Sequence, residues 1–358
     1  MEDGKIRIID NIGGAGLIKA AASSIKPSRA LKKMLSLGKV VSISKDSNPD
    51  GLSGPALLVH NYKVSDRNII LTNYKDLGDL LSYLKKRKIS NSSIVFSDLG
   101  ISPGNLEVNI KILRLLKSQN NTIIWIDHHP WEENVVSSVR KLIDFATFGE
   151  NPSYCATELV FLLLCNYDRT GREIAILAHY SDFPIKSKYD ALKKRLSYAI
   201  IGALYDDKSK DRNLRKIIRC ISNLDYENRQ IEEFRMKYVR NNERNTKLLL
   251  RNLYKIRAGK YLVGVGFSRR LETNSACATM KDELKTNINV YVAIDSGKSG
   301  IRSKDGIDSS KIAKALGGGG HPQASGFSIN PSKLKNSNKS EMEKFAKKIG
   351  RISDALYG

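Results

Sequence analysis

The segment Thr122-Ile-Ile-Trp-Ile126, followed by Asp127-His128-His129, is the stretch on which the interpretation of this sequence depends. Its β-branched and aromatic residues predict a buried strand. The three polar side chains then follow the carboxyl end of that strand, where open α/β sheets bind their ligands. An isolated histidine pair can equally be a capping or hydrogen-bonding pair, so the choice depends on the neighbouring segments.

Two upstream segments show the same arrangement of an apolar run followed by acids. The strand pattern Val40–Ser44 precedes Asp46, Asn48 and Asp50, which alternate and would project to one side of an extended segment. Gly51 then permits a tight turn into an apolar stretch suited to a helix that packs closely on a sheet. A second strand pattern, residues 93–97, ends at Asp98.

A fourth segment lies downstream, where residues 173–178 fit a strand or a buried helix and precede His179 and Asp182. Each of these carboxylates taken alone fits a turn or a helix N-cap. Four successive apolar segments that each end in an acid or a histidine favour a shared metal site instead. Carboxylates mixed with imidazoles suit Mn²⁺, or Mg²⁺ with less histidine, and two ions sharing one carboxylate are used for in-line attack at phosphorus.

These motifs resemble the DHH phosphoesterase superfamily, which includes RecJ nucleases, nano-RNases and the manganese pyrophosphatases. The resemblance covers the D-x-N-x-D-G turn at 46–51, Asp98, the Asp127-His128-His129 triplet and Asp182, in the expected order. A second block follows a strand pattern at 290–294. It comprises Gly300-Ile301-Arg302-Ser303 and a glycine-rich run from Gly317 to Gly326 that resembles the signature of the DHH-associated substrate domain, DHHA1.

The resemblance implies a role for each motif residue, with two Mn²⁺ ions as the expected cofactor and Mg²⁺ or Co²⁺ as substitutes. Asp98 is the expected bridge between the ions, Asp127 a ligand or an orienting residue, and His129 the contact to the scissile phosphate. The expected metal ligands are Asp46, Asn48, Asp50, Asp98, His128 and Asp182. The expected substrate-binding residues are Arg302, Ser303, Gly318, Gly319, Gly320 and His321.

One position departs from the family pattern. The first motif usually has an aspartate where this chain has Asn48, and a neutral amide is a poorer ligand for a divalent ion. Asn48 is therefore expected to weaken one metal site. It also leaves open the possibility of a catalytically impaired scaffold.

The length and order of the patterns predict an α/β protein of more than one domain. We expect an amino-terminal leader and helix at 1–37, with a glycine cluster at 13–16, before a mostly parallel, doubly wound DHH domain at 38–184. A helical linker at 185–257 and a smaller α/β DHHA1 domain at 258–358 follow, ending in a helix at 341–356. Strands are expected at 261–267 and 289–294.

The net charge of +23 points to a polyanionic partner. The basic clusters at 85–88, 193–195 and 212–219 are candidates for a nucleic-acid track, although solvated helix faces would look the same. No apolar run is long enough to span a bilayer, and no membrane partner is expected. Four scattered cysteines suggest free thiols in a reducing cytoplasm.

The leading function is a manganese-dependent exonuclease that hydrolyses single-stranded DNA, RNA or short oligonucleotides from an end. One alternative is a phosphodiesterase for cyclic or linear dinucleotides, which would not need so many cations. The other is a nucleic-acid-binding scaffold with an impaired centre in a replication or repair assembly. Cleavage polarity, the preferred nucleic acid and the oligomeric state stay open.

Overall fold

The computed structural model describes residues 31, 35, 38–149, 154–183, 185–206, 208–330 and 339–357. It divides the chain into two compact units, Met1–Tyr238 and Val239–Gly358. The glycine cluster at 13–16 and the predicted leader helix lie outside the described residues, except for Leu31 and Leu35, which are buried.

The first unit is built on a five-stranded, all-parallel sheet in the order β2-β1-β3-β4-β5. Most residues of these strands are buried because helices cover both faces, as expected for a doubly wound sheet. The strands are β1 (Lys39–Lys45), β2 (Ile69–Thr72), β3 (Ser92–Ser97), β4 (Thr122–Ile126) and β5 (Phe145–Thr147).

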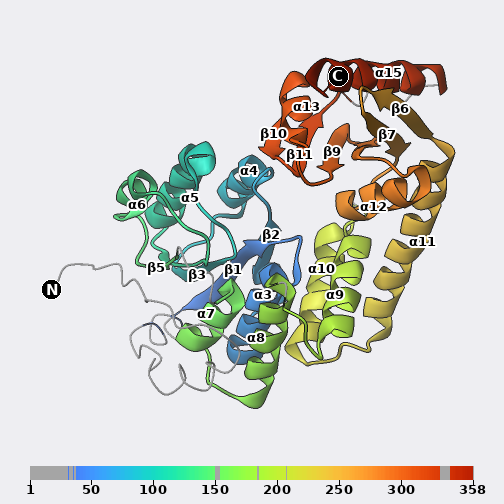
Figure 1. Ribbon diagram of the computed structural model, residues 1–358. Coiled ribbons are helices and arrows are strands. Elements are labelled where there is room, and N and C mark those ends of the chain that lie inside the picture. Colours follow the sequence, from blue (N-terminus) through green and yellow to red (C-terminus); the bar gives the residue numbers. More distant parts are fainter. Residues whose placement is uncertain are drawn as a thin grey trace. The chain divides into compact units, whose positions relative to one another are not determined.

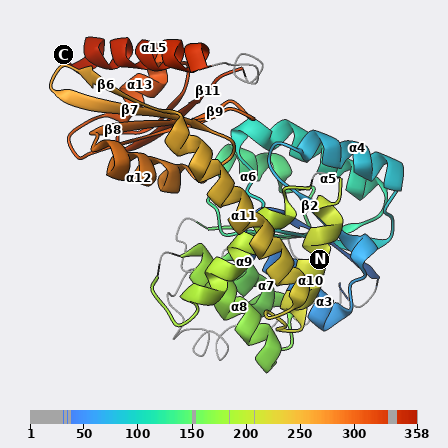
Figure 2. The same ribbon diagram turned by 90° about the vertical axis from the view of Figure 1, so that its right-hand side faces the viewer.

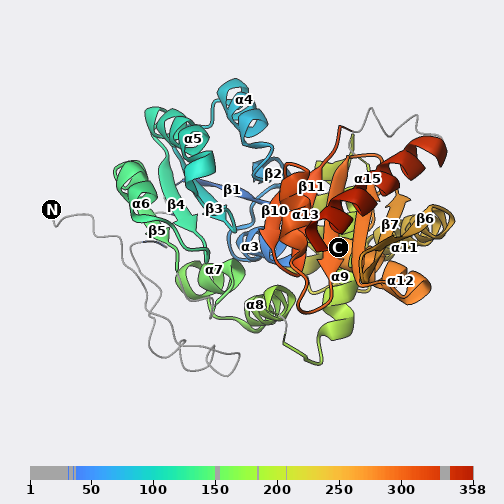
Figure 3. The same cartoon turned by 45° about the horizontal axis from the view of Figure 1, so that its top comes forward.

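Two sets of helices cover the two faces of this sheet (Figures 1 and 3). The first set, α4 to α6, packs on one apolar cluster, and the second set, α3 and α7 to α10, packs on the other. The first set is α4 (Leu77–Arg87), α5 (Leu106–Ser118) and α6 (Glu133–Val139). The second set is α3 (Pro49–Tyr62), α7 (Ala156–Leu164), α8 (Arg169–Asp182), α9 (Asp190–Ala203) and α10 (Lys210–Ser222).

The register of the parallel strands aligns their carboxyl ends. Ser97 at the end of β3 pairs with Ile126 at the end of β4, and Ser44 pairs with Ser97 across β1 and β3. The residues that follow these strands, Asp98 and Asp127 among them, therefore emerge at one edge of the sheet. This is the edge of the sheet at which the sequence predicts the metal site.

The second unit contains a six-stranded mixed sheet in the order β10-β11-β9-β8-β7-β6. Helices α13 and α15 cover one face of it, and α12 with the end of α11 covers the other (Figure 2). The strands are β6 (Leu253–Ala258), β7 (Tyr261–Ser268), β8 (Ile288–Ala293), β9 (Lys298–Ser303), β10 (Gly319–His321) and β11 (Ala324–Ser328). The helices are α11 (Arg229–Arg251), α12 (Thr273–Leu284), α13 (Ser309–Ala315) and α15 (Lys339–Tyr357).

The predicted fold class is confirmed, and most expected strands and the closing helix are present. Residues 173–178, which fitted either a strand or a helix, lie within α8. Strand β6 falls inside the expected helical linker because its half-exposed, alternating pattern is indistinguishable from a charged helix face. The domain boundaries themselves stay predictions.

Two composition-based expectations can be compared with the described residues. No helix among them is long and apolar enough to cross a membrane. All four cysteines are buried, and none of them forms a disulfide.

Gly202 sets the closest approach between α9 and α11. A Cβ at this position would collide with the backbone carbonyl of Phe234. We expect Gly202→Ala to lower the free energy of unfolding by about 1 to 3 kcal/mol, because backbone cannot move aside as a flexible side chain can. Thermal denaturation of the purified protein measures this.

The matched control is Gly78→Ala in α4, where a Cβ meets nothing within 4 Å. There we expect no loss of stability, or a small gain from the better helix propensity of alanine. A Gly202→Ala protein as stable as this control would contradict the described packing of α9 on α11.

Candidate metal centre

Six of the predicted site residues come together at the carboxyl edge of the parallel sheet. One group of potential ligand atoms, all within 4.8 Å of one another, comes from Asp98, Asp127, His128 and His129. A second group, which shares His128, comes from Asp50, His128 and Asp182. The first turn of α3, the ends of β3 and β4, and the last residue of α8 supply these side chains.

Local backbone geometry places the two central residues of the centre. Asp98 has a φ of +54°, in the left-handed region, where an aspartate costs less than most residues because its side chain can bond locally. This conformation turns the chain sharply at the end of β3, and the Asp98 N–H donates to the carbonyl of Ile126 at 3.2 Å. Gly51 allows α3 to begin beside the Lys45 carbonyl, which a Cβ would strike.

Three carboxylates surround the His128 imidazole. Its Nε2 atom lies 3.7 Å from an Asp98 oxygen and 3.7 Å from an Asp182 oxygen. An Asp50 oxygen lies 4.0 Å away. Ligands bonded to one divalent ion at about 2.0 to 2.5 Å lie about 3 to 4 Å from each other, so these separations suit a shared cation.

The polar atoms of the two central side chains are buried and lack hydrogen-bond partners among the described residues. The Asp98 side chain is 0% exposed and that of His128 is 10% exposed. Neither oxygen of Asp98 and neither ring nitrogen of His128 has a hydrogen-bond partner among the described residues. Buried polar atoms are nearly always paired, and an unpaired buried carboxylate is costly. The donor set therefore fits a bound metal ion.

The pKa values indicate an excess of negative charge in the centre. Burial and the nearby carboxylates of Asp98 and Asp182 raise the pKa of Asp50 from 3.8 to about 7. Burial opposes protonation of the His128 imidazole, but the surrounding carboxylates outweigh it and raise its pKa from 6.5 to about 9. Burial likewise raises the pKa of Asp182. A divalent cation would relieve this repulsion.

Asp127 holds its neighbours in position. One of its oxygens lies 2.8 Å from Nδ1 of His129, and the other accepts from Nε1 of Trp131 at 3.0 Å. The hydrogen bond to Asp127 raises the pKa of the His129 imidazole. Asp127 therefore orients His129 and Trp131, and its alternative role as a metal ligand stays a prediction.

Asp50 also connects the centre to a neighbouring helix. Its two oxygens accept from the backbone N–H groups of Ala156 and Thr157, at 3.0 and 2.9 Å. These are the first two residues of α7, so the carboxylate lies at the positive end of that helix. The sequence carried no signal for this contact, which joins residues more than a hundred positions apart.

Asp46 and Asn48 lie at the margin of the centre. Asp46 belongs to neither group of potential ligands, and it accepts a 3.3 Å hydrogen bond from the Asn73 amide. The side chain of Asn48 caps α3 by accepting from the Gly51 N–H at 2.9 Å. The metal-binding roles of these two residues stay predictions.

Lys45 is a feature of the centre that the sequence analysis missed. Its Nζ atom lies 3.5 Å from the second oxygen of Asp98, and its side chain is 20% exposed. The adjacent Tyr74 hydroxyl accepts from the Gly100 N–H. Lys45 is the last residue of β1, so the alignment of parallel strand ends was the available signal.

In the second unit, the sheet register brings two predicted substrate-binding residues onto one face. Arg302 in β9 pairs with Ala324 in β11, which pairs with His321 in β10. Directly paired residues point to the same face, so Arg302 and His321 flank the small Ala324 side chain. A pocket of about 200 Å³ adjoins Arg302 and contains Lys281 and Lys304.

The other predicted substrate-binding residues have structural contacts. The Ser303 hydroxyl donates to the Ile307 carbonyl at 2.7 Å, which ties down the following turn. The N–H of Gly318 donates to the Ala313 carbonyl at the end of α13. That N–H already has a partner within the unit, and Gly319 and Gly320 belong to β10, so the substrate-binding roles of these glycines stay predictions.

The comparisons with known proteins agree with this architecture. Residues 260–348 match the family described as the DHHA1 domain. Among solved structures, the DHH domain of a protein from a family of ribosomal proteins is 15% identical, with a TM-score of 0.56. That alignment covers 95% of this chain and 93% of the other.

RecJ from Thermus thermophilus, solved in complex with Mn²⁺, is 13% identical with a TM-score of 0.55. The alignment covers 95% of this chain but 55% of that RecJ, so the chain spans about half the RecJ length. Among curated proteins, no sequence matches the chain. The similarity to these two structures is a similarity of fold.

The charge balance of the centre predicts how stability responds to pH and to metal. In excess chelator, we expect the free energy of unfolding to fall as the pH rises from about 4 to about 9. Across that window folded Asp50 and then His128 hold protons that the unfolded chain has already released. Manganese should restore stability, and more at about pH 8.5 than at about pH 6, because its ligands must be deprotonated.

Asp98→Asn should lose most of the manganese-induced rise in melting temperature. Asp79→Asn, which removes an exposed carboxylate on α4, should retain that rise and serves as the control. An equal manganese response in both variants would mean that the ion binds elsewhere.

Proposed function

Because the chain belongs to the DHH/DHHA1 superfamily of phosphoesterases, we propose that it is a divalent-metal-dependent phosphodiesterase. Its substrate is single-stranded nucleic acid or a short oligonucleotide, hydrolysed from an end. The observation that carries the proposal is the buried Asp98 carboxylate beside the His128 imidazole, neither of which has a hydrogen-bond partner among the described residues. Without a cation, burial of these polar atoms would lower folding stability with no hydrogen bond to offset the cost.

Manganese is the ion that this donor set favours, since it accepts carboxylate and imidazole ligands together. Asp50, Asp98, His128 and Asp182 would hold it. The Thermus thermophilus RecJ of similar fold was solved with Mn²⁺, which supports the choice. Bound divalent ions stabilise the negative charge that develops on a phosphate under attack.

The protein residues around the ions position the substrate. His129 is fixed by the 2.8 Å contact between its Nδ1 and Asp127, which selects a protonated Nδ1. The raised pKa of His129 favours the imidazolium form. An imidazolium can donate its remaining N–H to a non-bridging phosphate oxygen, which is the role we propose for it.

We propose two ion positions with unequal affinity. Asn48 supplies a neutral oxygen where an aspartate would add charge, and the Lys45 ammonium group lies 3.5 Å from Asp98. Lys45 reduces the negative charge available to an ion beside Asp98, and Asn48 lacks the charge that an aspartate would add at the start of α3. The position lined by Asp50, His128 and Asp182 is then the tighter one.

Arg302 and His321 are the proposed contacts to the substrate end. Arg302 donates through Nε to Asn274 and through a terminal nitrogen to the Ile301 carbonyl, so the guanidinium is held in a fixed orientation. Guanidinium groups bind phosphate through paired hydrogen bonds. Capture of a terminus by such a residue supports exonuclease action.

A dinucleotide phosphodiesterase is the second candidate. The pocket beside Arg302, at about 200 Å³, is of a size to hold one end of a small substrate and not a long strand. A substrate-length series separates the two functions, because only the longer substrate requires further contacts outside this pocket.

The first functional test is metal-dependent hydrolysis. Wild-type protein with manganese should cleave a single-stranded oligonucleotide, and chelation should abolish the cleavage. Asp98→Ala and His128→Ala should each lower turnover at least about 100-fold, because each removes a ligand that stabilises charge in the transition state. The rate of product release, followed by gel or chromatography, measures this.

Asp79→Ala is the control for both variants and should retain wild-type turnover. Activity that survives excess chelator would refute the metal mechanism. A wild-type protein inactive on DNA, RNA and dinucleotides alike would support the scaffold alternative instead.

Asn48→Asp tests the unequal affinity of the two ions. Aspartate caps a helix as well as asparagine does, so α3 should remain intact. The added charge should lower the manganese concentration required for half-maximal stabilisation, as measured by thermal shift.

Asn120→Asp is the matched control because it adds the same charge just before β4, at the opposite edge of the sheet. It should leave the metal requirement unchanged. The idea fails if both variants, or neither, change the manganese requirement.

A further inference from the structure

Helix α11 carries a basic pocket that none of the predicted motifs includes. It has a volume of about 520 Å³ and lies wholly within the second unit. It is lined by Arg240, Glu243, Arg244, Asn245, Lys247, Leu248, Arg251 and Arg269. Five of these eight residues are cationic and one is acidic, and all six charged residues are exposed.

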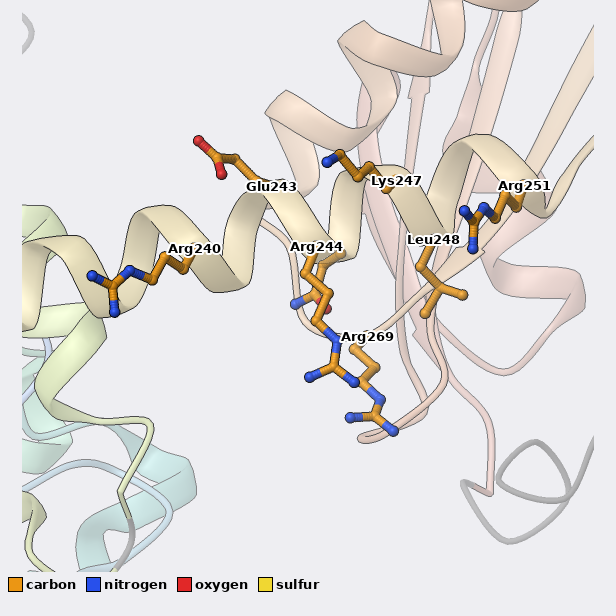
Figure 4. Close-up of a pocket in the computed structure, with 8 residues that line it drawn as sticks. Arg240, Glu243, Arg244, Lys247, Leu248, Arg251 and Arg269 are labelled. Atoms are coloured by element: carbon orange, nitrogen blue, oxygen red, sulfur yellow. The ribbon is translucent and has the colours of Figure 1, made fainter.

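The spacing of the cations places them in one row. Arg240, Arg244, Lys247 and Arg251 are separated by four, three and four residues, which keeps them on one face of a helix. The eleven residue-to-residue steps from Arg240 to Arg251 span about 16 Å along the axis. Figure 4 shows the Arg269 side chain, from the segment after β7, extending into the same space as Arg244. We call these five residues the basic α11 face.

The cations of the basic α11 face are available for a ligand. Among the described residues, none of the five forms an ion pair or a side-chain hydrogen bond. Asn245 of the same pocket, in contrast, is anchored through its amide, which donates to the Arg270 carbonyl at 3.0 Å. Unpaired guanidinium groups gathered in one pocket repel each other, and an anion relieves that repulsion.

In two of the basic clusters identified in the sequence, 193–195 and 212–219, cations are paired with acids. Lys193 lies 3.1 Å from Asp190, and Arg195 pairs with Glu227 and Glu232. Arg219 likewise donates to Asp66 at 2.7 Å. Neighbouring acids already neutralise much of their charge, so these clusters are weaker candidates for a nucleic-acid track than the basic α11 face.

We propose that the basic α11 face binds the phosphate backbone of single-stranded nucleic acid. This inference rests on the proposed phosphodiesterase function and names the part of the substrate that lies beyond the metal centre. A row about 16 Å long exceeds what one terminal phosphate needs, so it suits a chain with several phosphates. Arginines in a row bind such a chain without reading its bases.

The composition of the pocket argues against a membrane surface as the ligand. A helix that binds a bilayer presents bulky apolar side chains beside its cations. Leu248 is the one apolar residue among the eight that line this pocket, and it is half-buried.

The test is binding of a fluorescent thirty-nucleotide single strand to full-length protein in chelator, followed by anisotropy over a range of salt concentrations. Arg240→Gln, Arg244→Gln and Arg251→Gln are combined in one variant. We expect its Kd at about 0.1 M salt to rise at least about tenfold. The slope of log affinity against log salt should become shallower by about 2, at about 0.7 for each lost phosphate contact.

A charge-matched control replaces Lys344, Lys347 and Lys348 with glutamine, removing three exposed cations from α15. It should weaken binding less than threefold. Arg269→Gln provides a second variant outside α11 and should weaken binding severalfold. Melting temperatures identify any variant that fails to fold. If the triple variant does not fold, the strand affinity of Arg269→Gln tests the inference instead.

Hydrolysis assays distinguish failure of this inference from failure of the proposed function. The triple α11 variant should cleave a dinucleotide at the wild-type rate while losing rate on the long strand at low substrate concentration. A wild-type protein that binds the strand through these arginines but hydrolyses nothing would refute the phosphodiesterase proposal and keep the binding site.

Three results would overturn the inference. They are an unchanged salt slope in the triple variant, an equal loss in the Lys344/Lys347/Lys348 control, and equal competition by a polyglutamate of matched charge. The last result would indicate an acidic protein as the ligand.

Discussion

The constraint that organises the first unit is the burial of more carboxylates than cationic groups at the carboxyl edge of a parallel sheet. Asp98 is fully buried with no hydrogen-bond partner for either oxygen. Asp50 and Asp182 face the His128 imidazole, which Asp98 also faces. Parallel strands align their carboxyl ends, so the residues that follow neighbouring strands lie close together. A cation is the simplest way to make this arrangement stable, and the left-handed backbone of Asp98 shows that the chain accepts local strain to form it.

The contacts around the cluster hold it rigid. Asp50 is fixed by two backbone N–H groups at the start of α7, and Asp127 is fixed by His129 and Trp131. Elements distant in the sequence therefore determine where the ligands lie. Ligands positioned in advance need little reorganisation when an ion or a phosphate arrives, which is the condition for efficient electrostatic catalysis.

The sequence was sufficient to predict the strands that carry the centre because their apolar runs are short, β-branched and followed directly by acids. The strand-end rule, which requires only the order of elements, also brings Asp98 together with residues 127–129. It does not account for Asp182, which ends a helix, and Asp46 and Asn48 belong to neither group of potential ligands. The sequence could not reveal the Lys45 contact with Asp98 or the Asp50 contacts with α7, because these depend on side-chain direction and on pairs far apart in the chain. Helix α8 was ambiguous because a short apolar run fits both periods.

The sequence did not reveal which basic residues lie free of acidic neighbours. The contiguous cluster at 193–195 lies among acids that neutralise it, whereas the row on α11 is spread over twelve residues and joined by Arg269 from another segment. Helical spacing and tertiary neighbours, and not local density of charge, decide whether a cation is free to bind a polyanion.

Anomalous diffraction from manganese-soaked crystals tests the central claim most directly. The account predicts an anomalous peak at the manganese edge within about 2.0 to 2.5 Å of an Asp98 oxygen and of His128 Nε2. No peak there, with water or a side-chain hydrogen bond satisfying Asp98 instead, would contradict it.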